Sequence, residues 1–139
     1  MTAYKVHKED LLFPELSFQV VGILFEVHNT LGYGYLEKYY QKAIAALLTK
    51  AKIKFIEQAL VEIVIAGEVV AKGYADFIID DKIILEIKCL PVLTFREKKQ
   101  VWYYLKGTEY KLLLLVNFGG RKLEIVRRIY DKARFKDRS

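Results

Sequence analysis

Cysteine, proline and long apolar runs are all scarce in this chain of 139 residues. The single cysteine, Cys89, cannot form an internal disulfide, which excludes the class of small secreted domains held together by disulfides. No apolar run approaches the roughly 18 residues that a membrane-spanning helix needs, and the first residues lack the apolar core of a signal peptide. With only two prolines and eight glycines, no segment has the composition of a linker. We therefore expect one cytoplasmic domain, residues 1–139, with no membrane partner.

The composition is that of a folded protein, and its charge is unevenly spread. Apolar residues make up 53% of the chain and charged residues 29%, with a net charge of +6. From Arg121 to Ser139 there are eight basic residues against three acids, with Tyr130 and Phe135 interleaved. This pattern suits a polyanion such as nucleic acid, although a solvated C-terminal tail from about residue 131 is an equally good interpretation. The candidate nucleic-acid contacts in this segment are Arg121, Lys122, Arg127 and Arg128.

Hydrophobic periodicity predicts the order of the elements. Spacings of three and four residues predict a helix over 16–29, with Ser17 as its cap after Pro14, and a second helix over 35–51. From residue 53 the period becomes two, which predicts paired strands with a turn over 66–68. Further strands over 74–79 and 83–90 precede a helix over 94–106 that Gly107 ends, and strands over 110–117 and 123–129 follow. The predicted fold is α/β, in the order α-α-β-β-β-α-β-β around a mixed sheet.

Two carboxylates and a lysine interrupt the apolar strands. Asp76 lies in one predicted strand, and Glu86 and Lys88 lie in the next, where alternation puts both on one face. Burying such charges costs several kcal/mol unless a partner compensates. Two carboxylates beside a lysine can bind a hard divalent cation and hold a nucleophilic water. The alternatives are a structural ion pair or a solvated strand end.

The loop between these strands decides whether the carboxylates can converge. A two-residue turn at Asp80-Asp81 would set Asp76 opposite Leu85, with its carboxylate on the wrong face. A three-residue loop over 80–82 sets Asp76 opposite Glu86 instead. A metal site therefore requires an odd-numbered loop or a bulge, and Asp81 tolerates the left-handed conformation that such loops need.

Polar residues on two predicted helices complete the candidate site. Glu37 opens the second helix and shares a face with Tyr40, although a first-turn acid is also favoured by the helix dipole alone. Gln100 and Tyr104 lie four residues apart on the later helix, where a surface amide and a half-buried ring are the plain alternatives. Together they add a carboxylate, an amide and a phenol to the helices expected to flank the sheet.

These stretches give the chain a family resemblance over about residues 16–130. It resembles the PD-(D/E)xK nuclease superfamily, and more closely its small GxxExxY branch. Ala75 stands where the superfamily motif has proline, at a position that carries no ligand. The matching stretches are His28-Asn29-Thr30-Leu31-Gly32-Tyr33-Gly34, Tyr35-Leu36-Glu37-Lys38-Tyr39-Tyr40, Gly73-Tyr74-Ala75-Asp76, Leu85-Glu86-Ile87-Lys88, Gln100-Val101-Trp102-Tyr103-Tyr104-Leu105-Lys106 and Val116-Asn117-Phe118-Gly119.

The resemblance implies a role for each matching residue. Asp76, Glu86 and the carbonyl of Ile87 would ligate Mg²⁺ or Mn²⁺, with Glu37 as the extra helical carboxylate that binds the metal directly or through water. Lys88 would orient the attacking water or stabilise charge on the phosphate. Gln100 and Tyr104 match a Q-x-x-x-Y element that supports the active site and contacts DNA. His28 matches a family position at which we expect a turn-stabilising role.

The function expected from the sequence is a metal-dependent nuclease that hydrolyses phosphodiester bonds, with DNA as the expected substrate. One alternative is a nucleic-acid-binding or assembly module that keeps the fold but cleaves weakly or not at all. Another is a structural oligomerisation domain. A chain of this size has little room for a recognition domain, so we expect a partner or a homodimer to supply specificity.

Overall fold

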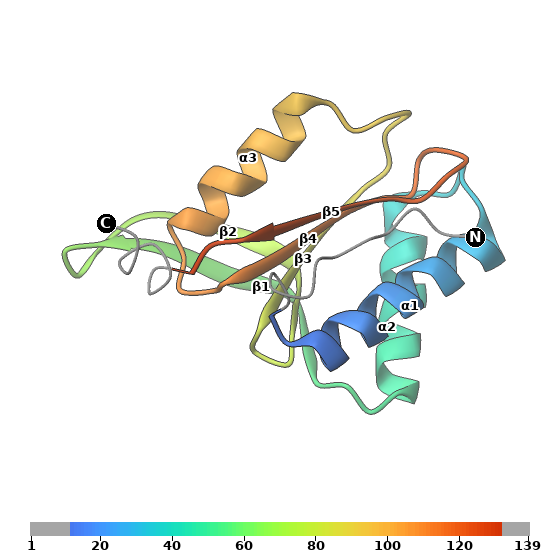
Figure 1. The fold of residues 1–139 in the computed structure, drawn as a ribbon, viewed down its shortest axis with the longest axis horizontal. Coiled ribbons are helices and arrows are strands. Elements are labelled where there is room, and N and C mark those ends of the chain that lie inside the picture. The colour runs from blue at the N-terminus through green and yellow to red at the C-terminus, as the bar shows by residue number, and fades with distance from the viewer. Residues whose placement is uncertain (1–11, 132–139) are drawn as a thin grey trace.

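A computed structural model describes residues 12–131 of the chain and shows a mixed five-stranded sheet with helices on both faces (Figure 1). The predicted order of elements is confirmed. The predicted basic tail lies outside the described residues, apart from Asp131. Among the described residues, no helix is long and apolar enough to cross a membrane. The elements are α1 (Pro14–Leu31), α2 (Glu37–Lys50), β1 (Phe55–Ile65), β2 (Glu68–Ile79), β3 (Ile83–Lys88), α3 (Phe95–Lys106), β4 (Leu112–Asn117) and β5 (Glu124–Ile129).

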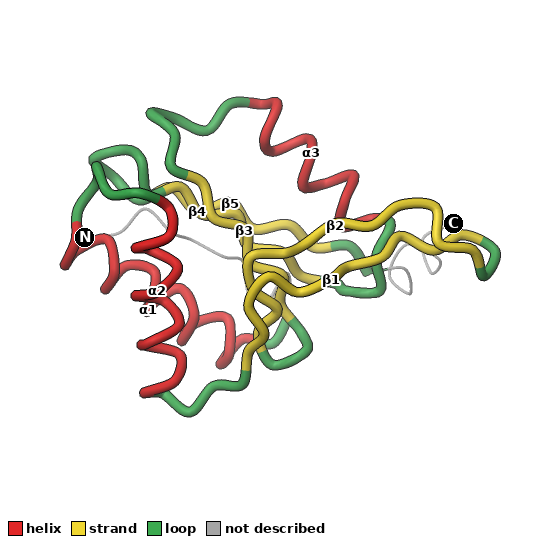
Figure 2. The backbone as a smooth tube through the Cα atoms, turned by 180° about the vertical axis from the view of Figure 1, so that it is seen from behind, coloured by secondary structure: helices red, strands yellow, loops and turns green. Residues whose placement is uncertain are grey.

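The strands lie in the order β1-β2-β3-β4-β5, and only the central pair β3–β4 is parallel. A parallel pair needs a long crossover, and α3 supplies it. Helices α1 and α2 cover one face of the sheet through side chains such as Leu24 and Ile44. Helix α3 covers the other face through Val101 and Leu105 (Figures 1 and 2). Strand β4 is buried along its whole length because it lies between these layers.

The hairpin between β2 and β3 has the predicted odd loop. Ile79 pairs with Ile83, so three residues, Asp80 to Lys82, form the loop. Asp80 and Asp81 both adopt the left-handed conformation, with φ of 49° and 55°. The Lys82 amide donates to the Ile79 carbonyl at 3.0 Å. The same register, continued one residue past the last printed pair, Phe77 and Leu85, sets Asp76 opposite Glu86.

Strands β1 and β2 form a longer hairpin than the sequence predicted. The strand carrying Asp76 begins at Glu68 and not near residue 74, and its distal half projects with β1 beyond the body of the sheet (Figure 2). The turn at Ala66 and Gly67 has two positive φ angles, 52° and 79°. Such turns match the twist of the flanking strands.

Two predictions about helix ends have different outcomes. Ser17 was expected to cap α1, which is wrong, because Phe13 holds the N-cap position with φ of 49° and Pro14 begins the helix. Gly107 does end α3, with a negative φ of −86°. Glycine is needed there for another reason, since a Cβ would lie 2.7 Å from Cγ2 of Ile63 on β1.

Candidate metal and nucleic-acid site

The site lies where β2 and β3 separate. Counted outward from the loop, their backbone ladder ends at the pair Phe77–Leu85, and Asp76 is the next residue of β2. Beyond that point Oδ2 of Asp76 accepts a hydrogen bond from the Ile87 amide at 2.7 Å. The carboxylate therefore lies directly against β3, beside the Glu86-Ile87-Lys88 segment.

Glu86 is the most strongly perturbed acid of the site. Burial is the main cause that raises its pKa, from its ordinary value of 4.5 to about 8, and the charges of Asp76 and Glu37 raise it further. Lys88 and the Asp76 backbone act in the opposite direction. In the absence of a cation, Glu86 is therefore largely protonated at neutral pH. A divalent ion would offset the same repulsion and favour the charged form.

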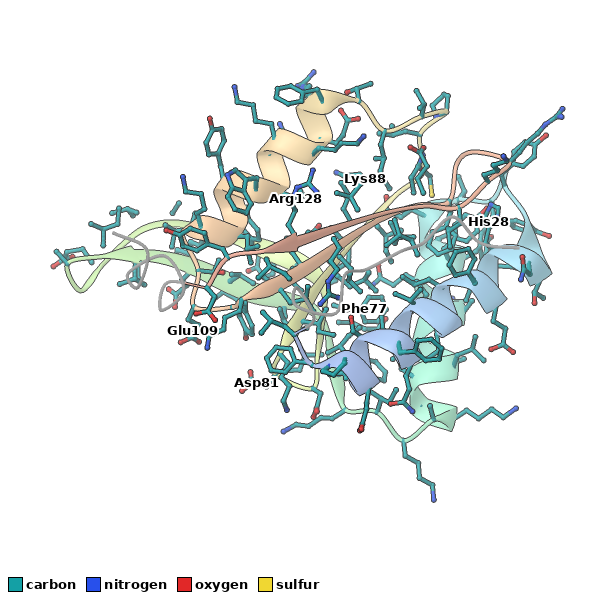
Figure 3. All side chains as sticks on the ribbon, in the orientation of Figure 1. His28, Phe77, Asp81, Lys88, Glu109 and Arg128 are labelled. Carbon is teal, nitrogen blue, oxygen red and sulfur yellow. The ribbon has the colours of Figure 1, made fainter. Side chains whose placement is uncertain are left out.

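Lys88 ends β3 on the face of the sheet that α3 covers (Figure 3). Its carbonyl accepts a hydrogen bond from the Phe118 amide at 2.9 Å, which continues the parallel ladder past the end of β4. Its ammonium lowers the pKa of both Glu86 and Glu37. Lys88 is therefore close enough to these carboxylates for its charge to act on their pKa values.

Glu37 approaches the same group from α2. Its pKa is raised by burial first and by the charge of Asp76 second, while Lys88 lowers it. One turn later, the fully buried Tyr40 donates its hydroxyl to the Gly32 carbonyl at 2.6 Å and stacks on Phe118 with ring centroids 4.5 Å apart. Tyr40 therefore anchors the start of α2 and holds Glu37 in place.

Gln58, which the sequence patterns did not single out, supports Asp76 and is itself bound by Gln41. Gln58 lies opposite Asp76 on β1 and donates Nε2 to Oδ1 of Asp76 at 3.3 Å and to Oε1 of Gln41 at 3.1 Å. Gln41 on α2 in turn donates to Glu57 at 3.4 Å. Gln58 adopts φ of 47°, a conformation that is strained for a residue with a side chain. The signal that could have found it is a glutamine within an apolar strand pattern.

Helix α3 brings Tyr104 to the carboxylates. Burial and the charge of Glu86 raise the Tyr104 pKa to about 12, so its hydroxyl stays protonated. This buried hydroxyl has no hydrogen-bond partner within residues 12–131. Gly73 on β2 faces the ring, and a Cβ there would lie 3.7 Å from it. Gln100, one turn earlier on the same face, is exposed.

The four basic residues predicted to contact nucleic acid lie on β5 and in the turn before it, and they fall into two groups. Arg121 and Lys122 are exposed in the turn after β4, and Arg128 lies on the face of the sheet that α3 covers (Figure 3). Arg127 lies on the opposite face, where its guanidinium donates to Oγ of Ser17 and to the Leu12 carbonyl. The structure therefore gives Arg127 a role in packing α1, in place of the nucleic-acid contact that the sequence predicted.

Asn117 and Gly119 fix the segment that follows Lys88. The buried Asn117 amide donates to the Leu90 carbonyl at 2.9 Å and accepts from the Leu90 amide at 2.8 Å. Gly119 packs so closely on Leu90 that a Cβ would lie 2.7 Å from the carbonyl carbon of Cys89. Nε2 of His28 lies 3.0 Å from the Gly120 carbonyl, so His28 contacts the turn after β4. Through these contacts Asn117 and Gly119 support the backbone that follows Lys88.

The oxygen atoms at this site suit a hard cation, although too few acidic side chains converge here to surround an ion completely. Across residues 12–131, no three His, Cys, Asp or Glu side chains form a cluster that could hold a metal. Asp76 and Glu86 with the Ile87 carbonyl offer oxygen donors, and Glu37 stands close enough to influence them electrostatically. Mg²⁺ usually takes one or two protein carboxylates and keeps several waters. The residues present therefore fit such an ion.

Comparison with known proteins identifies the family. The crystal structure of SSO0001 is 19% identical over 85% of this chain and 80% of that chain, with a TM-score of 0.44. The crystal structure of an alkaline exonuclease from Laribacter hongkongensis is 16% identical over 95% and 76% of the two chains, also with a TM-score of 0.44. The search of curated proteins gave no match. The sequence model of the PD-(D/E)XK nuclease superfamily matches residues 14–129, so the chain belongs to this superfamily.

Proposed function

We propose that this protein is a nuclease that uses Mg²⁺ or Mn²⁺ to hydrolyse phosphodiester bonds of nucleic acid, with DNA as its substrate. The observation that carries the proposal is the placement of Asp76, Glu86 and Lys88 together at the fork of β2 and β3. Membership in the nuclease superfamily supports hydrolysis of phosphodiester bonds. The half-buried Glu86, whose pKa is raised by burial and by the charges of Asp76 and Glu37, supplies the reason for a divalent cation.

Asp76, Glu86 and the Ile87 carbonyl would hold the metal, with Glu37 bound directly or through water. When bound, the ion would lower the pKa of an attacking water and offset charge on the phosphoryl oxygens. Gln58 and the Ile87 amide hold the two oxygens of Asp76 in a fixed orientation. This preorganisation reduces the reorganisation needed when the substrate binds.

Lys88 and the residues of α3 act on the substrate. The Lys88 ammonium orients the water or stabilises the negative charge that develops on the phosphate. Tyr104 keeps its proton, with a pKa of about 12, so it can donate a hydrogen bond to a phosphate oxygen. Gln100 lies exposed on the same face of α3 and can contact the adjoining nucleotide.

We also assign the chain to the GxxExxY branch of the superfamily. The structural roles of the three motif residues, Gly34, Glu37 and Tyr40, support this assignment. Gly34 adopts φ of 104°, which disfavours other residues, Glu37 faces the carboxylates, and Tyr40 ties the turn to the core.

A cleavage assay tests the proposal. Labelled single-stranded, duplex and branched DNA and matched RNA are incubated with the protein and Mg²⁺, Mn²⁺ or a chelator. We expect metal-dependent cleavage that Asp76→Asn and Lys88→Met abolish, while Glu62→Gln, an exposed acid on the β1–β2 hairpin, leaves it unchanged. Binding without cleavage of any substrate, with either metal, would identify a binding module and overturn the proposal.

A further inference from the structure

The outer face of α3 carries two exposed aromatic rings and two lysines at helical spacing. Phe95, Lys99, Tyr103 and Lys106 are separated by four, four and three residues, so they share one face. We call these four residues the aromatic–lysine stripe. Phe95 is 75% exposed and Tyr103 57% exposed. Large rings left this open to water are candidates for contact with another molecule.

The lysines of the stripe lie beside the rings. Nζ of Lys99 is 5.8 Å from the centroid of the Phe95 ring and 5.6 Å from that of Tyr103. Nζ of Lys106 is 5.8 Å from the Tyr103 centroid. The stripe is therefore a continuous surface in which positive charge alternates with apolar rings.

The positive charge of α3 is not neutralised by ion pairs among residues 12–131. The helix carries four basic residues and one acid, Glu97, whose carboxylate caps the helix by accepting the Thr94 amide at 2.8 Å. Within residues 12–131, none of the four basic side chains forms an ion pair with a carboxylate. This unpaired positive charge is complementary to a polyanion.

The stripe adjoins the site already described. Val101 and Leu105 pack α3 on the sheet, so the stripe lies on the side of the helix that faces away from it. Gln100 and Tyr104 lie between these two sides, and Tyr104 is close enough to Glu86 for the charge to raise its pKa. A chain bound along the stripe can therefore pass Gln100 to reach the carboxylates.

We propose that the aromatic–lysine stripe binds a single strand of nucleic acid, with unpaired bases stacked on Phe95 and Tyr103 and phosphates held by Lys99 and Lys106. A duplex hides its base faces in the helical stack, whereas an unpaired base can cover an exposed ring. Phe95 and Tyr103 are eight residues apart, about 12 Å along a helix, which leaves room for backbone phosphate beside Lys99. This inference rests on the proposed function for the choice of nucleic acid as the ligand, but it concerns binding and not cleavage.

Equilibrium binding without metal tests the inference. Fluorescence anisotropy in chelator compares single-stranded DNA, single-stranded RNA of the same sequence and blunt duplex, over a range of salt concentrations. The test variants are Phe95→Ala with Tyr103→Ala, and Lys99→Gln with Lys106→Gln. The matched controls are Phe18→Ala, an aromatic 82% exposed on α1, and Lys42→Gln with Lys50→Gln, two exposed lysines on α2.

We expect the aromatic pair of substitutions to weaken single-strand binding roughly tenfold or more, with little change for duplex or in the salt slope. The lysine pair should weaken binding and flatten the salt slope. The controls should bind as the wild type does, and all variants should keep its melting temperature because the altered side chains are exposed.

Wild-type single-strand affinity in the aromatic variant would overturn the inference, as would equal losses for single strand and duplex. A wild-type protein with no preference for single strands would overturn it as well. If binding follows the expected pattern but no substrate is cleaved, the proposed nuclease fails and this inference stands. If cleavage occurs and the stripe variants bind normally, only this inference fails.

Discussion

The Asp76 carboxylate accepts a hydrogen bond from the Ile87 amide at 2.7 Å. It stands in for a backbone carbonyl, because the ladder between β2 and β3 has already ended at this point. The amide of a buried strand must find an acceptor, and here a side chain supplies it. The position of the carboxylate is therefore set by the pairing of the sheet. Because Gln58 holds the other oxygen, Asp76 has little freedom left.

The first prediction concerns metal binding. Asp76→Asn and Glu86→Gln keep the shape of the site but remove the charged donors, so both should abolish Mn²⁺ binding measured by calorimetry. Glu37→Gln should weaken it about tenfold, as the loss of an outer partner does. Glu62→Gln serves as the control for a lost surface carboxylate. Unchanged affinity in the Asp76 and Glu86 variants would disprove the metal site.

The second prediction concerns the pH dependence of stability without metal. The folded chain holds a proton on Glu86 up to a pKa of about 8, whereas the ordinary value is 4.5. The folded state therefore binds more protons in this window, and stability should fall as pH rises through it. Glu86→Gln should flatten the decline by up to about 1.4 kcal/mol per pH unit in chemical denaturation. Parallel profiles for the two proteins would contradict the perturbed carboxyl.

The third prediction distinguishes two effects of Gln58, its positioning of Asp76 for metal binding and its effect on the stability of the fold. Gln58→Ala and Gln58→Gly both remove the amide that binds Asp76, so both should weaken Mn²⁺ binding to a similar degree. Glycine accepts the positive φ of 47°, so Gln58→Gly should be about 1 kcal/mol more stable than Gln58→Ala. Wild-type metal affinity in both variants would show that the amide does not position Asp76.

The fourth prediction compares two glycines. Gly119→Ala would push a Cβ into the backbone of Leu90, so it should lower the free energy of unfolding by about 3 kcal/mol or more. Gly22→Ala, in the middle of α1 with open space around its Cβ, should instead raise it by roughly 0.5–1 kcal/mol. Denaturant titrations measure both. Equal effects of the two changes would contradict the close packing of Gly119.

The sequence was sufficient for features that depend on local pattern. The element order follows from periodicity, and the three-residue loop follows from the requirement that Asp76 and Glu86 share a face. Ser17 and Arg127 could not be assigned in this way, because they bind each other across 110 residues of sequence. Gln58 is visible in the sequence only as a glutamine within an apolar strand pattern, because its bond to Asp76 depends on a strained backbone angle that no spacing rule predicts.

The parallel pairing of β3 and β4 also sets an order of assembly. Asp76 and Glu86 can meet as soon as a hairpin with a three-residue loop forms, at a small cost in chain entropy. In the folded sheet Glu86 pairs with Leu115 of β4, so the surroundings of its carboxyl are complete only when α3 has crossed over and β4 is in place. We expect β4 to dock later, since contacts that are distant in sequence form slowly. The raised pKa of Glu86 is therefore a marker of a completely folded chain, which distinguishes it from a chain that has formed only the hairpin.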